Sequence, residues 1–222
     1  MQTGRKTKLD TKAFAVMGML SAIAFVAKLI SNVFPMVSGF LSFDLKDVII
    51  VIAGFMMGPV ASVLISIVVS FVEMVTISMT GPIGFLMNVL ASCAFAVTAS
   101  VIYHRNRKMS GAVTGLLAGV LVMTGVMILW NWLITPLYMG VPREVVEGML
   151  LPVFLPFNLV KGGINATLAM ILYKPIVGAL RKARLIEDGG VGNRTTKWGV
   201  LAVSLVLLAT FVLLGLVLAG VI

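Results

Sequence analysis

Charged side chains are what this 222-residue sequence has least of. It contains 17 basic and 8 acidic residues, or 11% of the chain, against about 25% in soluble domains. Apolar residues make up 60% of the chain, and the mean hydropathy is +1.12. So few charges cannot cover the surface of a soluble domain, which excludes a soluble enzyme and a disordered protein. We therefore predict an all-α, polytopic integral membrane protein.

Cysteine and histidine occur once each, as Cys93 and His104. One cysteine excludes a disulfide framework, and we expect His104 to be solvated in a cytoplasmic loop. The sequence has no metal-ligand cluster, no paired carboxylates, no Ser/His/Asp set and no nucleotide-binding G-x-x-x-x-G-K-[ST] loop. We predict no catalytic residues, no metal site and no enzyme activity. A relay of carboxylates or histidines for proton pumping is also missing.

Apolar stretches of membrane-spanning length follow one another along the chain. Five are clear, at about 13–34, 83–103, 111–138, 150–173 and 198–222. Residues 45–79 as one helix would rise roughly 52 Å, against a hydrocarbon core of about 30 Å. Gly58-Pro59, a strong turn signal, divides this stretch into 45–58 and 59–79. The sequence thus predicts seven spans.

The basic residues support the same number of spans. They cluster near the N-terminus, at 104–108 and at 174–197. Seven spans place all three clusters on one side of the membrane, whereas a single helix over 45–79 separates the first cluster from the others. By the positive-inside rule, we predict a multi-pass cell-membrane protein with a cytoplasmic N-terminus and an external C-terminus. The clusters carry no recognition motif, so nucleic-acid binding is not expected.

The chain divides into three predicted parts. Residues 1–184 form a six-helix membrane unit and 185–197 a polar cytoplasmic linker. The last part, 198–222, is a further C-terminal transmembrane helix, nearly pure Leu, Val, Ala and Gly. Because it has so few polar side chains, we interpret it as an appended anchor to membrane lipid.

Amide and ionisable side chains inside spans usually face a cavity or a partner. Asn158, Lys161 and Asn165 share one helix face, and Asn131 lies at a similar predicted depth. Pro152 and Pro156 predict an irregular start to the Asn158 helix. The candidate ligand-binding residues combine polar groups with aromatic walls: Asn131, Asn158, Lys161, Asn88, Trp130 and Phe157. Such a set suits a neutral, planar, heteroaromatic ligand with carbonyls and hydroxyls. The alternative for the asparagines, left open here, is hydrogen bonding between helices.

Four further charges border or enter the spans. Lys28 is expected to extend its ammonium to the outer interface. Glu73 is the only acid within a predicted span and the expected partner of Lys161. Asp44 and Asp47 flank the start of the short second span, where carboxylates cap free amides. Ordering the outer loop over a site is their alternative role.

Three segments carry a resemblance to a known family. They read LSFDLKDV at 41–48 with GPVA at 58–61, NWLITPLY at 131–138 and LPFNLVKG at 155–162. In order and spacing, the chain over about 10–180 resembles the riboflavin-specific substrate-binding (S) components of energy-coupling factor transporters, the RibU family.

The resemblance implies a six-helix bundle that binds riboflavin near its outer face, under the loop after the first span. It implies ligand hydrogen bonds from Asn131, Asn158 and Lys161, and no resident cofactor, since riboflavin is the transported ligand. A small-residue face on the first span, here Gly18 and Ala22, would dock on a transmembrane coupling subunit whose two ATPase subunits supply the energy. Glu73, where an uncharged polar residue is expected, and the seventh span depart from the family pattern.

Three other functions remain open from the sequence. An S component for another small vitamin would share most of these features. An autonomous secondary carrier would need an ion-coupling carboxylate, for which only Glu73 is available. A structural membrane subunit would use its asparagines to join helices and would leave no cavity.

Overall fold

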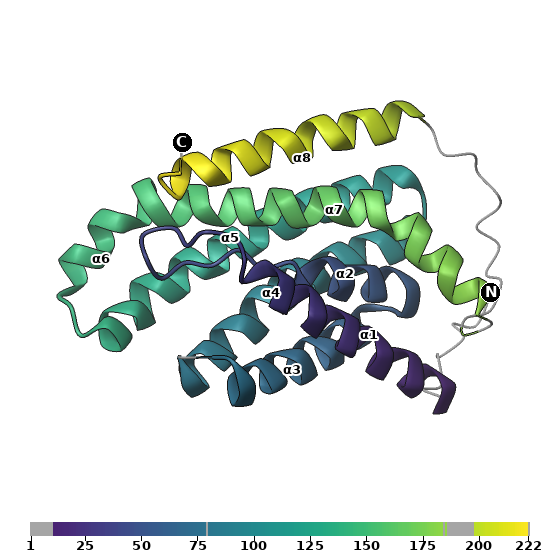
Figure 1. Ribbon diagram of the computed structural model, residues 1–222, viewed down its shortest axis with the longest axis horizontal. Coiled ribbons are helices and arrows are strands. Elements are labelled where there is room, and N and C mark those ends of the chain that lie inside the picture. Colours follow the sequence, from purple (N-terminus) through teal and green to yellow (C-terminus); the bar gives the residue numbers. More distant parts are fainter. Residues whose placement is uncertain (1–10, 79, 184, 186–197, 222) are drawn as a thin grey trace.

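The protein is a bundle of membrane-length helices, seen in a computed structural model that describes residues 11–78, 80–183, 185 and 198–221 (Figure 1). The helices are α1 (Thr11–Ser31), α2 (Lys46–Met57), α3 (Pro59–Thr76), α4 (Gly81–Arg105), α5 (Met109–Met139), α6 (Arg143–Met149), the π-helix η1 (Leu150–Phe154), α7 (Leu155–Lys182) and α8 (Trp198–Leu218). Because α6, η1 and α7 follow one another without interruption, the described residues form seven continuous helical segments, here called rods. The predicted all-α membrane fold is confirmed.

Six of these rods are long and apolar enough to cross a membrane within the described part of the chain; α2 is the exception. Its 12 residues rise about 18 Å, well short of a bilayer core. Every residue from Lys46 to Phe55 is buried, and α2 packs against α1, α3, α4 and α7. At Gly58 the chain turns with φ +101°, and Pro59 starts α3, which confirms the predicted division. The short helix α2 therefore lies at the centre of the bundle.

The C-terminal end of α2 is capped by side chains of α4. The carbonyl oxygen of Gly54 accepts hydrogen bonds from Ser100 Oγ at 2.7 Å and from the backbone N–H of Gly58 at 2.9 Å. His104 Nε2 lies 3.1 Å from the same oxygen. The expectation that His104 is a solvated loop residue is therefore wrong: α4 continues past the end of α2, so His104 is half-buried and caps it.

Helices α4 and α5 approach each other closely along a line of glycines in α5. A Cβ atom at Gly115 would lie 2.7 Å from the carbonyl oxygen of Ala99, and one at Gly119 would lie 2.6 Å from that of Phe95. Both obstacles are backbone atoms, which cannot rotate away. Small residues four apart allow this kind of backbone contact in membrane helices. The glycines of α5 thus set the distance between α4 and α5.

α8 runs along α7, and its C-terminal end lies beside the α1–α2 connection (Figure 1). Its start at Trp198 agrees with the predicted span. The predicted linker 185–197 lies outside the described residues, except for Leu185. The irregular start predicted from Pro152 is confirmed, because η1 contains this proline and widens the helix locally.

We expect Gly119→Ile to lower the free energy of unfolding in detergent by about 2 kcal/mol, because the new side chain must push α4 away from α5. The matched control is Gly125→Ile on the same helix, where nothing lies within 4 Å of an added Cβ. Denaturant titration of both variants checks this. Equal loss of stability in the two would contradict the close α4–α5 contact.

Candidate ligand site

The α1–α2 loop (residues 32–45) folds inward over the bundle. Val37 and Leu41 exchange two backbone hydrogen bonds, with N–O distances of 2.8 and 3.0 Å. At the tip, Ser38 and Gly39 take φ of +52° and +78°, and glycine adopts the second of these without steric penalty. Phe40 and Leu41 of this short hairpin line a pocket, and Leu41 also packs against the apolar cluster that contains Phe43.

Four contacts hold this loop against the bundle. Phe40 meets Phe154 of η1 edge to face at 6.0 Å, and Phe43 packs on Phe157 of α7 at 5.3 Å between ring centroids. Asn165 Nδ2 donates to the carbonyl of Asp44 at 2.9 Å. The remaining contact is a hydrogen bond of 2.9 Å from the Leu45 backbone N–H to Ser31 Oγ. The loop is thus fixed to α1 and α7 at its base.

Beneath the loop lies a group of charges, here called the ion cluster, of which five are buried and Lys161 is half-buried: Lys28, Asp44, Lys46, Asp47, Glu73 and Lys161. At its centre, the Lys46 ammonium contacts Glu73 Oε2 at 2.5 Å and Asp44 Oδ2 at 2.9 Å. Lys28 contacts the other oxygen of Glu73 at 3.5 Å. The side chains in these three pairs are at most 7% exposed. The pairs join α1, α2, α3 and the loop.

Asp47 and Lys161 extend the ion cluster to α4 and α7. Ser92 Oγ donates to Asp47 Oδ1 at 2.5 Å, and Lys161 interacts electrostatically with Asp44 and Asp47. Three ammonium and three carboxylate groups cancel formally, which suits a site away from water. Burial alone raises the pKa of Asp44, but Lys46, Lys161 and Lys28 together hold that pKa well below its usual range. Asp44 therefore stays ionised throughout the neutral range.

The ion cluster corrects two predictions. Lys28 does not extend to the interface; it is 5% exposed and paired with Glu73. Glu73 pairs with Lys46 and Lys28, where the sequence predicted Lys161. The reason is that the loop brings Asp44 and Lys46 into the bundle, so more charges are buried than the spans alone contain.

The predicted capping roles of the two aspartates hold only in part. Asp44 Oδ1 accepts the backbone N–H of Lys46 at 3.1 Å, which caps one free amide of α2. Asp47 bonds Ser92 of α4 through its side chain and so connects two helices.

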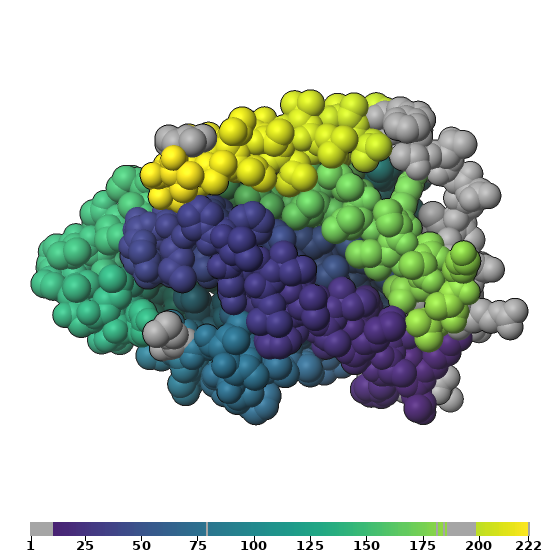
Figure 2. All heavy atoms as spheres, viewed as in Figure 1, coloured from purple at the N-terminus to yellow at the C-terminus, as the bar shows by residue number. Residues whose placement is uncertain are grey.

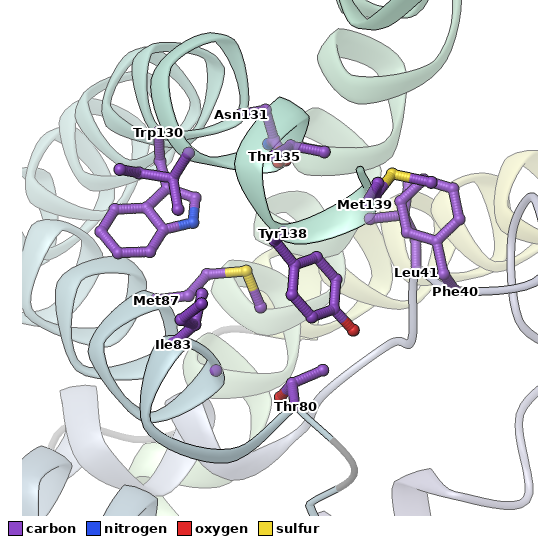
Figure 3. Close-up of a pocket in the computed structure, with 12 residues that line it drawn as sticks. Phe40, Leu41, Thr80, Ile83, Met87, Trp130, Asn131, Thr135, Tyr138 and Met139 are labelled. Carbon is purple, nitrogen blue, oxygen red and sulfur yellow. The ribbon is translucent and has the colours of Figure 1, made fainter. Parts of the chain in front are cut away.

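A pocket opens beside the loop, between the N-terminal end of α4 and the C-terminal end of α5 (Figure 3). Its cavity volume is about 70 Å³, below the roughly 300–1,000 Å³ of small-molecule sites, so a ligand of vitamin size requires the pocket to widen. Most of its wall is apolar or aromatic, with a few hydroxyls and one amide: Phe40, Leu41, Thr80, Ile83, Gly84, Met87, Trp130, Asn131, Ile134, Thr135, Tyr138 and Met139.

Two of the six predicted ligand residues, Trp130 and Asn131, line this pocket. Asn131 is held by its own helix: Nδ2 donates to the carbonyl of Met127 at 2.7 Å, and Oδ1 accepts from Thr135 Oγ1 at 2.8 Å. A carboxamide has two N–H groups and two lone pairs. One donor and one acceptor of Asn131 thus remain for a ligand.

The other four predicted residues lie outside the described lining of this pocket. Asn158 is 4% exposed and donates from Nδ2 to the carbonyl of Phe154 at 2.8 Å. Phe157 packs under the loop, and Lys161 belongs to the ion cluster. Asn88 is half-buried on α4, next to the pocket residue Met87. The α1–α2 loop contacts both the pocket, through Phe40 and Leu41, and α7, through Phe43 and Asp44.

Several pocket residues were not selected from the sequence. Tyr138 and Thr135 follow Asn131 at i+7 and i+4, so helical periodicity alone places them on one face of α5. Phe40 and Leu41 carry no such signal, because a loop side chain is positioned only by tertiary contacts.

Gly18 and Ala22, the predicted docking face, are exposed on α1. An added Cβ at Gly18 would meet nothing within 4 Å. This face points away from the bundle and is free for a close contact.

We expect Glu73→Gln to lower the free energy of unfolding by about 3 kcal/mol, because Lys46 and Lys28 lose their shared counter-charge while still buried. The double variant Lys28→Met/Glu73→Gln should recover part of the loss, since it restores charge balance. Glu144→Gln on exposed α6 is the control. Denaturant titration in detergent measures all three, and a Glu73→Gln protein as stable as the control would contradict the ion cluster.

Comparison with known proteins places this geometry in a family. Residues 12–173 match the family described as "ECF transporter, substrate-specific component". The chain is 30% identical over 189 residues to the riboflavin transporter RibU of Staphylococcus aureus (strain TCH60), covering 82% of this chain and all of that protein. It is 27% identical over 189 residues to the riboflavin transporter FmnP of Bacillus subtilis (strain 168), covering 80% of this chain and all of that protein.

A solved structure gives the same result. It is described as the S component of a bacterial ECF transporter, and it superposes with a TM-score of 0.65 at 32% identity. The match covers 77% of this chain and 98% of that structure. A family match over most of the bundle and a shared fold agree. The chain is a multi-pass membrane protein that belongs to the substrate-specific components of energy-coupling factor (ECF) transporters.

Proposed function

We propose that this chain is the riboflavin-binding subunit of an ECF transporter and mediates uptake of the vitamin across the cell membrane. The observation that carries the proposal is the similarity to two riboflavin transporters, each covered over its whole length. The resemblance of the 131–138 and 155–162 segments to the riboflavin branch supports the same ligand.

The chemistry of the pocket suits such a ligand. Trp130 and Tyr138 provide flat surfaces for an aromatic ring system, and aromatic pairs in offset or edge-to-face contact are favourable. The free N–H and lone pair of Asn131 match a ligand edge on which a carbonyl stands beside an N–H. We propose that Asn158 and Lys161 complete the site from α7 when the loop rearranges around the bound ring.

In this proposal the chain supplies binding and its partners supply energy. A transmembrane coupling subunit would dock on the Gly18–Ala22 face of α1, and two ATPase subunits would drive release to the inside. The N-terminus would lie in the cytoplasm and the C-terminus outside. The helix directions agree, because the loop, α6 and the end of α8 lie at the same end of the bundle (Figure 1).

Purified protein from rich medium should carry a yellow chromophore, and the apo protein should quench flavin fluorescence on titration. Asn131→Ala, Asn158→Ala and Lys161→Ala should each weaken riboflavin binding about tenfold or more, the factor that corresponds to about 1.4 kcal/mol. Asn106→Ala, exposed at the inner end of α4, is the control. A colourless protein that binds a different vitamin would contradict the riboflavin proposal, and uptake into vesicles without any ATPase would indicate a secondary carrier.

Ala22→Phe should leave riboflavin affinity unchanged in the isolated chain. In vesicles that contain the coupling and ATPase subunits, it should reduce uptake at least about tenfold, because a bulky side chain prevents close helix approach. Ile23→Phe puts the same ring about 100° around the helix and should have little effect. Equal uptake by the two variants would remove the docking role of Gly18 and Ala22.

A further inference from the structure

The C-terminal helix α8 lies beyond the residues that match the family, which end at 173. Much of it is exposed, as expected for a helix that faces lipid. Its C-terminal half is different, because several of its side chains join an apolar cluster with the α1–α2 loop and α7. The members from α8 and the residues after it are Leu208, Phe211, Leu218 and Ala219; those from the loop and α7 include Val37, Phe43, Phe157, Val160 and Ile164.

Two glycines allow α8 to come this close. A Cβ at Gly163 of α7 would lie 2.5 Å from the ring of Phe211, so this ring rests directly on the backbone of α7. A Cβ at Gly215 of α8 would lie 3.1 Å from the ring of Phe43 and 3.6 Å from Val160. Earlier residues of α7 thus meet later residues of α8. The two helices are antiparallel, and the end of α8 reaches the loop.

The space-filling view shows the same arrangement. The end of α8 lies directly against the loop on the surface (Figure 2). Phe43 is therefore enclosed between Phe157 of α7 and Gly215 of α8, and only 7% of it remains exposed.

Phe43 lies between the ion cluster and the pocket in the sequence of the loop. On one side it precedes Asp44, which belongs to the ion cluster, and on the other it is three residues from the pocket residue Phe40. Asp44 and Phe40 are both held against the bundle. A displacement of Phe43 would therefore also move Phe40, which lines the pocket.

We propose that α8 is an intramolecular brace: Gly215 and Phe211 position Phe43 and so hold the α1–α2 loop over the ligand pocket. The brace slows release of the ligand to the outside. The effect on release rests on the proposed riboflavin binding, whereas the α8 contacts do not. Gly215 and Phe211 are positioning residues, since they act on the ligand through the loop.

The test measures riboflavin dissociation from the full-length chain by stopped-flow recovery of flavin fluorescence. Gly215→Leu should raise the dissociation rate about tenfold, equivalent to about 1.4 kcal/mol, because the added side chain displaces Phe43. The control is Gly199→Leu on the same helix, where nothing lies within 4 Å of an added Cβ. This variant should release riboflavin at the wild-type rate.

A milder pair of variants covers the case in which Gly215→Leu does not fold. Phe211→Ala removes the ring that seats α8 on Gly163 and should also speed dissociation, while Leu213→Ala, 56% exposed on the same helix, should not. Wild-type rates for both Gly215→Leu and Phe211→Ala, or for Phe211→Ala alone if Gly215→Leu does not fold, would overturn the brace.

A ligand-independent measurement separates the two proposals. In a Cys93→Ser background, Val160→Cys and Gly215→Cys lie close enough for an intramolecular disulfide when an oxidant is added. Protection of both thiols from maleimide after oxidation is the expected result, and labelling of both would overturn the α8 contact. If the double-cysteine variant forms the cross-link but the wild-type chain binds no riboflavin, the riboflavin proposal fails while the α8 contact stands.

Discussion

The buried contact between Lys46 and the carboxylates of Glu73 and Asp44 is the interaction on which the arrangement of the α1–α2 loop depends. A lone charge in an apolar bundle is strongly unfavourable, so each of these groups requires the others. This need for charge compensation has a consequence for the fold. It draws the base of the α1–α2 loop into the bundle and connects α1, α2 and α3 at one point. Removing any one of the three leaves an uncompensated charge beneath the loop.

With its base fixed, the loop covers one side of the pocket. The tip contributes Phe40 and Leu41 to the pocket, while the ion cluster holds Asp44 only a few residues away. α7 adds Phe157 and Asn165 from below, and α8 adds Gly215 from the side. The loop thus combines a base that is anchored by charges with a segment that covers the pocket, an arrangement that suits a ligand-binding subunit.

The path of the chain could be predicted from the sequence because its causes are local. Gly58-Pro59 is a strong turn signal, and long apolar runs predict the six membrane-length helices, although α2 is too short for the seventh predicted span. The partners of Lys28 and Glu73 could not be predicted, since these pairs join residues that are far apart in the chain. His104 was misplaced for a similar reason, because its partner Gly54 lies 50 residues earlier in the chain. At the pocket, Trp130 and Asn131 could be selected by residue type, but the loop residues Phe40 and Leu41 could not.

A crystal structure of the full chain with bound riboflavin tests the central claim most directly, namely that a loop anchored by neutralised buried charges covers a flat ligand. The account predicts the flavin ring between Trp130, Tyr138 and the tip of the loop, with Asn131 hydrogen-bonded to the ring edge and Lys46 still in contact with Glu73 and Asp44. A flavin bound away from the loop, or a Lys46 ammonium separated from both carboxylates, would contradict it.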